Sequence, residues 1–92
     1  MSVKEKIKDH VKNINKSNVY VGIASDLKQR LFEDHNVDEK NGHYIGLNAE
    51  TSAKAREIEK ALLAEGFKGG PGGGDYSTKY VYAYRITTST VQ

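Results

Sequence analysis

The chain has 92 residues, of which 37% are hydrophobic and 28% are charged, and its formal net charge is 14 − 12 = +2. These values fit one small globular domain spanning residues 1–92, with a charge too small to indicate nucleic-acid binding by itself. The absence of cysteine excludes disulfides and thiolate metal sites and favours a cytoplasmic location. No apolar run approaches the length of a membrane span, so we expect no membrane partner.

The first predicted element is a helix over residues 3–14. Ser2 and Glu5 form a capping-box pattern at its start. The apolar stripe then recurs at steps of four, four and three residues, at Val3, Ile7, Val11 and Ile14. Residues 1–16 hold five lysines against two acids, a local charge of 5 − 2 = +3. This charge has two interpretations, a solvated helix face and a patch that attracts phosphates.

A strand, a turn and a second helix follow in the most informative stretch of the chain. Residues 19–23 are β-branched or aromatic apart from one glycine, as in a half-buried strand. The run stops at a Ser-Asp pair, whose side-chain oxygens can cap the first turn of a helix that reaches His35. The unit therefore carries Tyr20 on a strand and Arg30 about one turn into a helix.

The second half of the chain is predicted to add two strands and a helix. After a polar loop, residues 43–47 form a short strand. Residues 51–65 form a helix that ends at Gly66, where a left-handed backbone is well tolerated. Residues 79–86 form the last strand, with apolar or aromatic side chains on both faces. An edge strand can leave one face polar, so we expect this strand in the middle of the sheet beside residues 19–23.

The predicted elements alternate in the order α-β-α-β-α-β. We therefore expect an α+β fold in which a small three-stranded antiparallel sheet is flanked by three helices. The chain shows no internal repeat and no boundary between domains.

Glu59 stands out on the third predicted helix. At 100° per residue it falls inside the apolar stripe, about 40° from Ala55. A carboxylate in that position is costly to bury unless a metal, a cation or a hydrogen-bond donor compensates its charge. The alternative is a carboxylate at the rim, whose stem packs while its head reaches solvent.

Arg30 and His35 each have a structural and a functional interpretation. The Arg30 guanidinium is a planar fork suited to a phosphate, but it can also pair with Asp34 one helical turn later. His35 can act in catalysis, or it can serve as a positive charge at the end of a helix dipole.

A glycine run and a row of tyrosines complete the candidate features. The run Gly69–Gly74, interrupted by Pro71, can form a nest of N–H groups around an anion or simply connect a helix to a strand. It lacks the features of a P-loop. The tyrosines of the last strand can stack on bases or form part of the core.

Five of these residues together resemble the GIY-YIG nuclease superfamily. That family has a Tyr-Ile-Gly strand, a helix with an arginine and a histidine, and a later helix whose glutamate binds a divalent metal. Tyr20 and Gly22 match the strand, Arg30 and His35 match the first helix, and Glu59 matches the metal ligand. The resemblance spans about residues 18–65 and extends to a small stand-alone branch that ends in a glycine-rich loop and a Val-Tyr-Xaa-Tyr strand.

The chain departs from the family pattern in its spacing and its order. His35 lies five residues after Arg30 where the family usually has four, which leaves Asp34 in the expected position. The literal Tyr44-Ile45-Gly46 looks like the signature but lacks the arginine that follows it.

No Gly-Ile-Tyr strand precedes residue 19. We therefore expect residues 79–82 to supply the missing central strand from the other end of the chain, a permuted arrangement. Tyr82 or Tyr80 would then approach Tyr20 from the neighbouring strand.

The resemblance implies a divalent-metal-dependent nuclease that cleaves phosphodiester bonds of DNA or RNA and binds them weakly and salt-sensitively. Glu59 would hold one Mg²⁺ or Mn²⁺, and Arg30 would bind the scissile phosphate. Tyr20 would orient or deprotonate the attacking water, with His35 and Tyr82 as further catalytic residues. The substrate would contact Gly22, Lys28, Gly72, Gly73 and Gly74. The alternative is a non-catalytic module of the same fold that binds nucleic acid or a protein partner.

Overall fold

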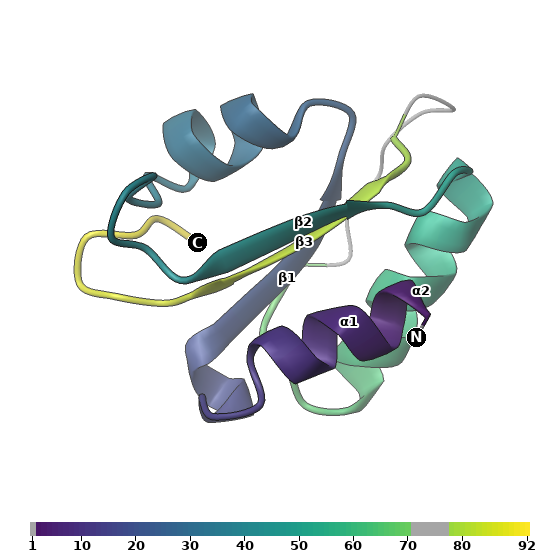
Figure 1. Ribbon diagram of the computed structural model, residues 1–92, viewed down its shortest axis with the longest axis horizontal. Helices are drawn as coiled ribbons and strands as arrows, with labels where there is room; N and C mark the ends of the chain where they lie inside the picture. Colours follow the sequence, from purple (N-terminus) through teal and green to yellow (C-terminus); the bar gives the residue numbers. More distant parts are fainter. Residues whose placement is uncertain (1, 71–77) are drawn as a thin grey trace.

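The computed structural model describes residues 2–70 and 78–92 (Figure 1). The predicted alternation of helices and strands is confirmed, with one additional 3₁₀ turn before the first strand. The elements are α1 (Val3–His10), η1 (Lys16–Asn18), β1 (Val19–Ala24), η2 (Gln29–Asp34), β2 (Tyr44–Asn48), α2 (Ser52–Ala64) and β3 (Tyr80–Arg85).

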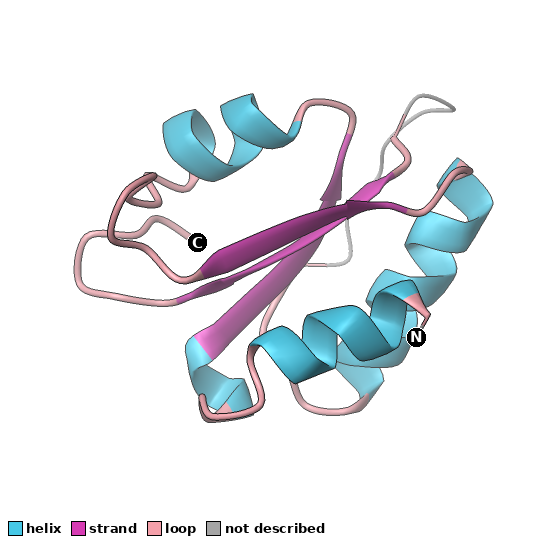
Figure 2. Ribbon diagram, in the orientation of Figure 1, coloured by secondary structure: helices cyan, strands magenta, loops and turns pink. Residues whose placement is uncertain are grey.

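The three strands form one antiparallel sheet in the order β1-β3-β2 (Figure 2). The last strand in the sequence is therefore the central one, as predicted from its two apolar faces. In this register Tyr20 of β1 lies opposite Tyr84 of β3, and Gly22 lies opposite Tyr82. The tyrosines of β1 and β3 are thereby brought together on one face of the sheet, because side chains alternate between the two faces of a strand.

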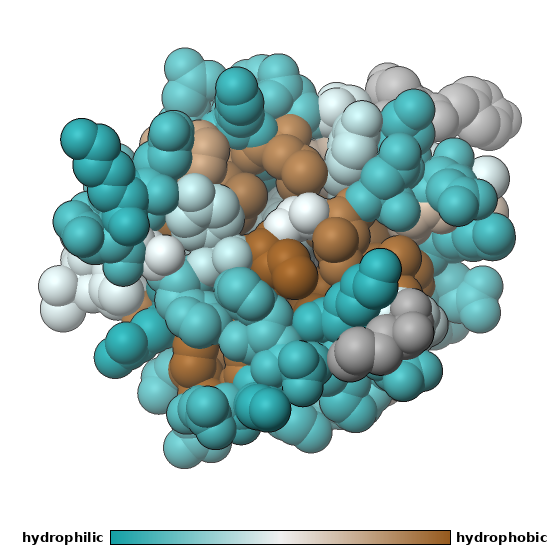
Figure 3. Space-filling view, viewed as in Figure 1, coloured by the Kyte–Doolittle hydropathy of each residue, from teal (hydrophilic) through white to brown (hydrophobic). Residues whose placement is uncertain are grey.

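The helices cover both faces of the sheet (Figure 1). On one side α1 and α2 pack over a mostly aliphatic layer that includes Val21, Val81 and Ala83. On the other side η2 packs over Tyr82 and Tyr84, which are 3% and 0% exposed. Figure 3 shows a mostly polar surface, with apolar side chains gathered near the middle of the view where β2 forms the near edge of the sheet.

The outer edge of β1 is also hydrogen-bonded, by the segment after α2. The Val21 N–H donates to the Lys68 carbonyl (2.8 Å), and the Lys68 N–H donates to the Val19 carbonyl (2.9 Å), in a parallel bridge. Glycine is required next, because a Cβ at Gly69 would lie 2.5 Å from the Val21 carbonyl oxygen. This contact fixes where the chain enters the glycine-rich segment.

Two helices differ from their predicted form. The first ends at His10 rather than at Ile14, and the chain continues in tight turns in which the Ile14 N–H donates to the Val11 carbonyl (3.0 Å). Val and Asn are weak helix formers and account for this early end, while Ile14 still packs on the core. The second helix starts as expected, with the Asp26 carboxylate accepting from the Gln29 N–H (3.2 Å), but continues as a π-helix.

The third helix matches its prediction closely. The Thr51 hydroxyl accepts from the Lys54 N–H (3.1 Å) at its start, and Gly66 has the left-handed φ of 109° just after its end. In the part of the chain that the structure describes, helices are too short and too polar for a transmembrane segment.

Candidate active site

The centre of the candidate site is a hydrogen bond between His35 and Tyr82. The His35 Nε2 atom lies 2.7 Å from the Tyr82 hydroxyl, and His35 is only 7% exposed. The rings of Tyr20 and Tyr84 surround the same imidazole, with centroids 4.9 and 5.0 Å from its own. We call these four side chains, Tyr20, His35, Tyr82 and Tyr84, the tyrosine–histidine cluster. His35 caps the end of η2, as expected, and its ring is buried among these tyrosines rather than directed into solvent.

The π-helix explains the unusual spacing between Arg30 and His35. The His35 N–H donates to the Arg30 carbonyl (3.0 Å), five residues back rather than the four of an α-helix. One additional residue is accommodated in the turn, so that His35 faces the sheet. Asp34, which occupies the position expected for the histidine, instead faces solvent with a side chain 46% exposed. A π-bulge of this kind is frequent at functional sites.

The Tyr82 hydroxyl also experiences the charges of the other candidate residues. Burial raises its pKa well above the usual value of 10, and the neighbouring Tyr20 raises it further. The positive charge of Arg30 lowers this pKa, and the negative charge of Glu59 raises it. Residues from β1, η2 and α2 thus act electrostatically on one oxygen of β3.

Glu59 is buried on the inner face of α2. It is 6% exposed, in the same row as Ala55 and Leu62, which are fully buried. The interpretation of Glu59 as a rim carboxylate with its head in solvent is therefore wrong. Among the described residues, no group of three His, Asp or Glu side chains is arranged to hold a metal. A single carboxylate still suits Mg²⁺, which keeps several waters and takes further oxygens from a substrate phosphate.

Arg30 lies at the open side of η2. Its Nε is 3.6 Å from the Asp34 carboxylate, and both side chains are about half exposed (49% and 46%). An exposed pair of this kind contributes only about 0.2–0.5 kcal/mol, so it leaves the guanidinium available to a phosphate. Arg30 also lines a polar pocket of about 180 Å³ together with Ser25, Asp26, Gln29 and Asp34. Lys28 is exposed and directly precedes Gln29 in the chain, one of the residues that line this pocket.

The structure gives Gly22 a packing role. A Cβ at this position would lie 2.5 Å from Cζ of Tyr82, so only glycine leaves room for the Tyr82 ring beside it. A Cβ at Gly70 would lie 3.7 Å from the Tyr20 hydroxyl, which places the start of the glycine-rich segment beside the cluster. Gly72, Gly73 and Gly74, the predicted substrate contacts, lie outside the described residues.

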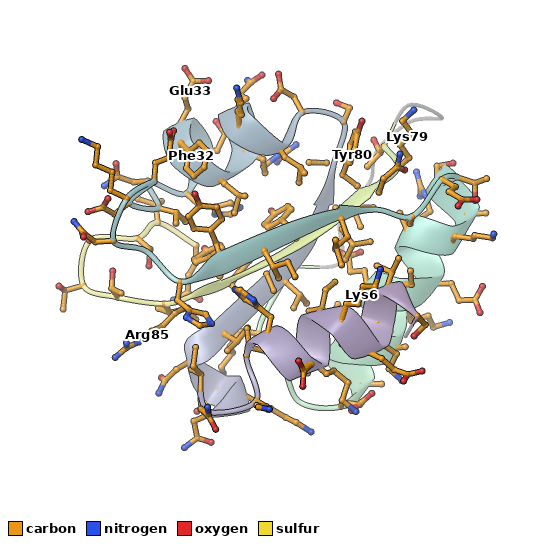
Figure 4. All side chains as sticks on the ribbon, in the orientation of Figure 1. Lys6, Phe32, Glu33, Lys79, Tyr80 and Arg85 are labelled. Atoms are coloured by element: carbon orange, nitrogen blue, oxygen red, sulfur yellow. The ribbon has the colours of Figure 1, made fainter. Side chains whose placement is uncertain are left out.

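Two other tyrosines are not members of the cluster, although Tyr44 is the cross-strand partner of Tyr84. Tyr80, the alternative to Tyr82, pairs with Ala24 at the opposite end of β1 from Val19, and Figure 4 shows it near Lys79 at that end of β3. Tyr44 donates its hydroxyl to the Glu39 carbonyl (2.9 Å) and packs edge-on against Phe32. Tyr44, which resembles the family signature in sequence, therefore has a packing role on the edge strand β2.

Most of the lysines of the first helix have a structural use. Lys4 and Lys8 lie 2.7 and 2.6 Å from the Glu65 carboxylate, and Lys16 lies 3.8 Å from it. These ion pairs join α1 and η1 to the end of α2, on the side of the sheet opposite the cluster (Figure 1). Part of the charge expected on a solvated helix face is therefore paired with Glu65.

Two groups beside His35 were not predicted as site residues from the sequence, Tyr84 and the backbone of Val91. The Val91 carbonyl oxygen lies 2.6 Å from His35 Nδ1, and the Tyr84 hydroxyl lies 3.2 Å from the same oxygen. Tyr84 shares a strand face with Tyr82, so the period of two in the tyrosine row was a usable signal. A backbone carbonyl gives no such signal, because every residue has one.

Comparison with known families identifies the fold. The family model described as the GIY-YIG catalytic domain matches residues 10–67, more than half of the chain. The chain belongs to the GIY-YIG family. This membership indicates a nuclease-type or nucleic-acid-related function. Searches of curated proteins and of solved structures found no match.

The central strand of this GIY-YIG domain lies outside the matched segment. The match ends at residue 67, and β3 begins at Tyr80. The sheet nevertheless has β3 between β1 and β2, in agreement with the expected permutation.

Proposed function

We propose that this GIY-YIG domain is a divalent-metal-dependent nuclease that hydrolyses phosphodiester bonds of DNA or RNA. The observation that carries the proposal is the 2.7 Å hydrogen bond between Tyr82 and His35. A buried tyrosine whose hydroxyl is bonded to an imidazole has a route for proton transfer. A purely structural tyrosine needs only one hydrogen-bond partner of any kind.

Tyr82 and His35 together supply a base for water. The Tyr82 oxygen accepts a proton from the attacking water while its own proton moves to His35 Nε2, so the imidazole becomes imidazolium. The water oxygen forms a bond to phosphorus, and the bond between phosphorus and the leaving oxygen breaks. Burial opposes a stable phenolate at Tyr82, and a transfer that passes the proton onward avoids that intermediate. Tyr20, whose ring lies beside His35, orients the water.

Arg30, Lys28 and Glu59 complete the proposed site. The Arg30 guanidinium binds the scissile phosphate through its forked donors, and the exposed Lys28 contacts a neighbouring phosphate. Glu59 would hold Mg²⁺ or Mn²⁺, an ion that stabilises negative charge on the phosphate and on the leaving oxygen. A cytoplasmic location, expected from the lack of cysteine, stays a prediction.

A cleavage assay with matched variants tests the proposal. Labelled single- and double-stranded DNA and RNA are incubated with the full chain in Mg²⁺, Mn²⁺ or EDTA. Tyr82→Phe and Glu59→Gln should each reduce the cleavage rate by about 100-fold or more, since each removes a transition-state contact. Arg30→Lys should also be severe, because an ammonium cannot make the forked contact.

Two control variants separate chemistry from packing. Tyr44→Phe removes a hydroxyl from the neighbouring strand, where it contacts only the Glu39 carbonyl, and Glu57→Gln removes an exposed carboxylate from α2. Both should cleave at the wild-type rate. Binding of nucleic acid without metal-dependent cleavage would contradict the proposal and support a non-catalytic module.

A further inference from the structure

The segment that follows β3 folds back over η2 and is fixed there by hydrogen bonds. The Val91 N–H donates to the His35 carbonyl (2.8 Å), and the Asn36 side-chain amide donates to the Ser89 carbonyl (2.9 Å). The Val91 carbonyl oxygen lies 2.6 Å from Nδ1 of the His35 ring. Val91 therefore contacts His35 through its backbone at two points, while the residue as a whole is 56% exposed. We call residues 87–92 the return segment.

The chemistry of these partners determines where the imidazole proton lies. A backbone carbonyl oxygen only accepts hydrogen bonds, so the group that faces it on His35, Nδ1, must carry a proton. In the neutral imidazole the other nitrogen, Nε2, then has a free lone pair. That lone pair faces the Tyr82 hydroxyl, which must therefore donate. Both short contacts are satisfied by one tautomer only.

Tyr84 reinforces this arrangement. Its hydroxyl lies 3.2 Å from the Val91 oxygen, to which it donates, and 3.1 Å from His35 Nδ1, from which it can accept part of the same proton. Tyr84 is fully buried, and burial raises the pKa of its hydroxyl, so it stays protonated and keeps its donor. The Val91 oxygen is thus held by one donor from β3 and one from η2.

We propose that the Val91 carbonyl, held by Tyr84, is a positioning group that fixes His35 as its Nδ1–H tautomer and so makes Nε2 the proton acceptor for Tyr82. The inference rests on the proposed nuclease function, because it assigns to the return segment the orientation of the proposed base. In the other tautomer Nε2 would donate to Tyr82 and could not take its proton. A tautomer lock of this kind has a large effect in other enzymes, where presenting the wrong nitrogen reduces kcat by about 10⁴-fold.

The first test reads the tautomer directly, without activity. Two-bond ¹H–¹⁵N spectra of the ¹⁵N-labelled full chain distinguish a protonated from an unprotonated ring nitrogen at each histidine. Wild-type His35 should show a protonated Nδ1 and an unprotonated Nε2 at neutral pH. The opposite pattern would overturn the inference whatever the cleavage assay shows. An inactive wild-type chain with the expected pattern would count against the proposed function instead.

The second test removes the positioning group. Deletion of residues 89–92 should populate the Nε2–H tautomer and reduce kcat by about 100-fold or more, with KM little changed, because the phosphate contacts remain. Thr88→Ala changes an exposed residue of the return segment that the deletion leaves in place, so it is the matched control and should behave as wild type. An unchanged tautomer and an unchanged kcat in the deletion would contradict the proposal.

Tyr84→Phe provides a second variant in case the deletion fails to fold. It keeps the ring and removes the hydroxyl that contacts the Val91 oxygen. Both His35 tautomers should then be detected in the same spectra. A pure Nδ1–H pattern with wild-type kcat would show that Tyr84 plays no positioning role and would overturn that part of the proposal.

Discussion

Tyr82 and Gly22 are direct partners across β3 and β1, and the Tyr82 ring fills the space that a side chain at position 22 would need. The missing Cβ leaves room for the ring beside β1, and its hydroxyl lies 2.7 Å from His35 Nε2. The glycine of the family signature strand therefore has a steric purpose in this chain. It determines the position of the tyrosine on the neighbouring strand.

Gly22→Ala should damage both stability and activity. The added methyl would lie 2.5 Å from Tyr82 Cζ, so the buried ring must move away from His35. Overpacking of this kind costs about 1–3 kcal/mol, which urea denaturation would measure. Gly46→Ala is the control, because its Cβ would meet Leu27, on η2's side of the sheet, rather than Tyr82. It should lose stability but keep the histidine–tyrosine contact, and equal cleavage by both variants would contradict the argument.

Lys28 and Arg30 should account for much of the nucleic-acid affinity. Each replacement by alanine should weaken binding and reduce the slope of log K against log salt by about one. Lys6→Ala is the control, because Lys6 is exposed on α1, away from η2 (Figure 4). Fluorescence anisotropy at several salt concentrations measures the slopes. A larger effect of Lys6 than of Lys28 would instead support the phosphate patch on the first helix.

The Glu65 ion pairs should make stability depend on pH below neutrality. Hydrogen bonds from Lys4 and Lys8 lower the pKa of Glu65 from 4.5 to about 2. Because the folded value is the lower one, this stabilisation is complete above pH 4.5 and is lost as the pH falls from 4.5 towards about 2. Glu65→Gln should therefore flatten the pH dependence of the melting temperature in that window.

Glu33→Gln is the control for this prediction, because Glu33 is exposed on η2 (Figure 4) and should keep the wild-type profile. High salt should reduce the difference between wild type and Glu65→Gln, since exposed charges are screened. A difference that persists in high salt would indicate a packing effect rather than an ionic one.

Glu50→Gly should stabilise the protein. Glu50 has a φ of 75°, a left-handed conformation that is unfavourable for a residue with a Cβ. Glycine relieves that strain but is more flexible when unfolded, so the expected net gain is about 0.5–1 kcal/mol. Glu50→Ala keeps the strain and removes only the exposed 4.0 Å contact with Lys54, so its stability should be close to wild type. Thermal denaturation of the wild type and of the two Glu50 variants measures these differences in stability.

The arrangement of the sheet could be predicted from the sequence because it depends on local patterns. Apolar side chains on both faces of residues 79–86 indicated a strand covered on both sides, and β3 is central. The burial of Glu59 followed from helical periodicity, although its rim alternative could be excluded only from the structure. Tyr82 and His35 were both named as candidates, but their direct contact joins residues 47 positions apart and has no local signature.

The remaining features depend on tertiary structure. The sequence around Arg30 has good α-helical spacing, and the one departure, the additional residue between Arg30 and His35, does not by itself specify the π-turn that directs His35 to the sheet. Packing of η2 on the tyrosine face decides between the two hydrogen-bond patterns. Similarly, the first helix has an apolar stripe through Ile14, but weak helix formers end it at His10 while the stripe continues to pack. The regular spacing of apolar residues thus indicated that Ile14 packs on the core, even though the backbone there is not α-helical.

The order of the strands has a consequence for how the protein is made. Among the described strands, β1 and β2 each pair only with β3, which is the last of the three to be synthesised. On a ribosome that adds about 5–20 residues per second, β1 and β2 are therefore synthesised before β3, the strand to which both of them pair. His35 and Tyr20 have already been synthesised at that stage, but Tyr82, whose hydroxyl contacts His35, has not. The contact between Tyr82 and His35 therefore cannot form until β3 has been synthesised.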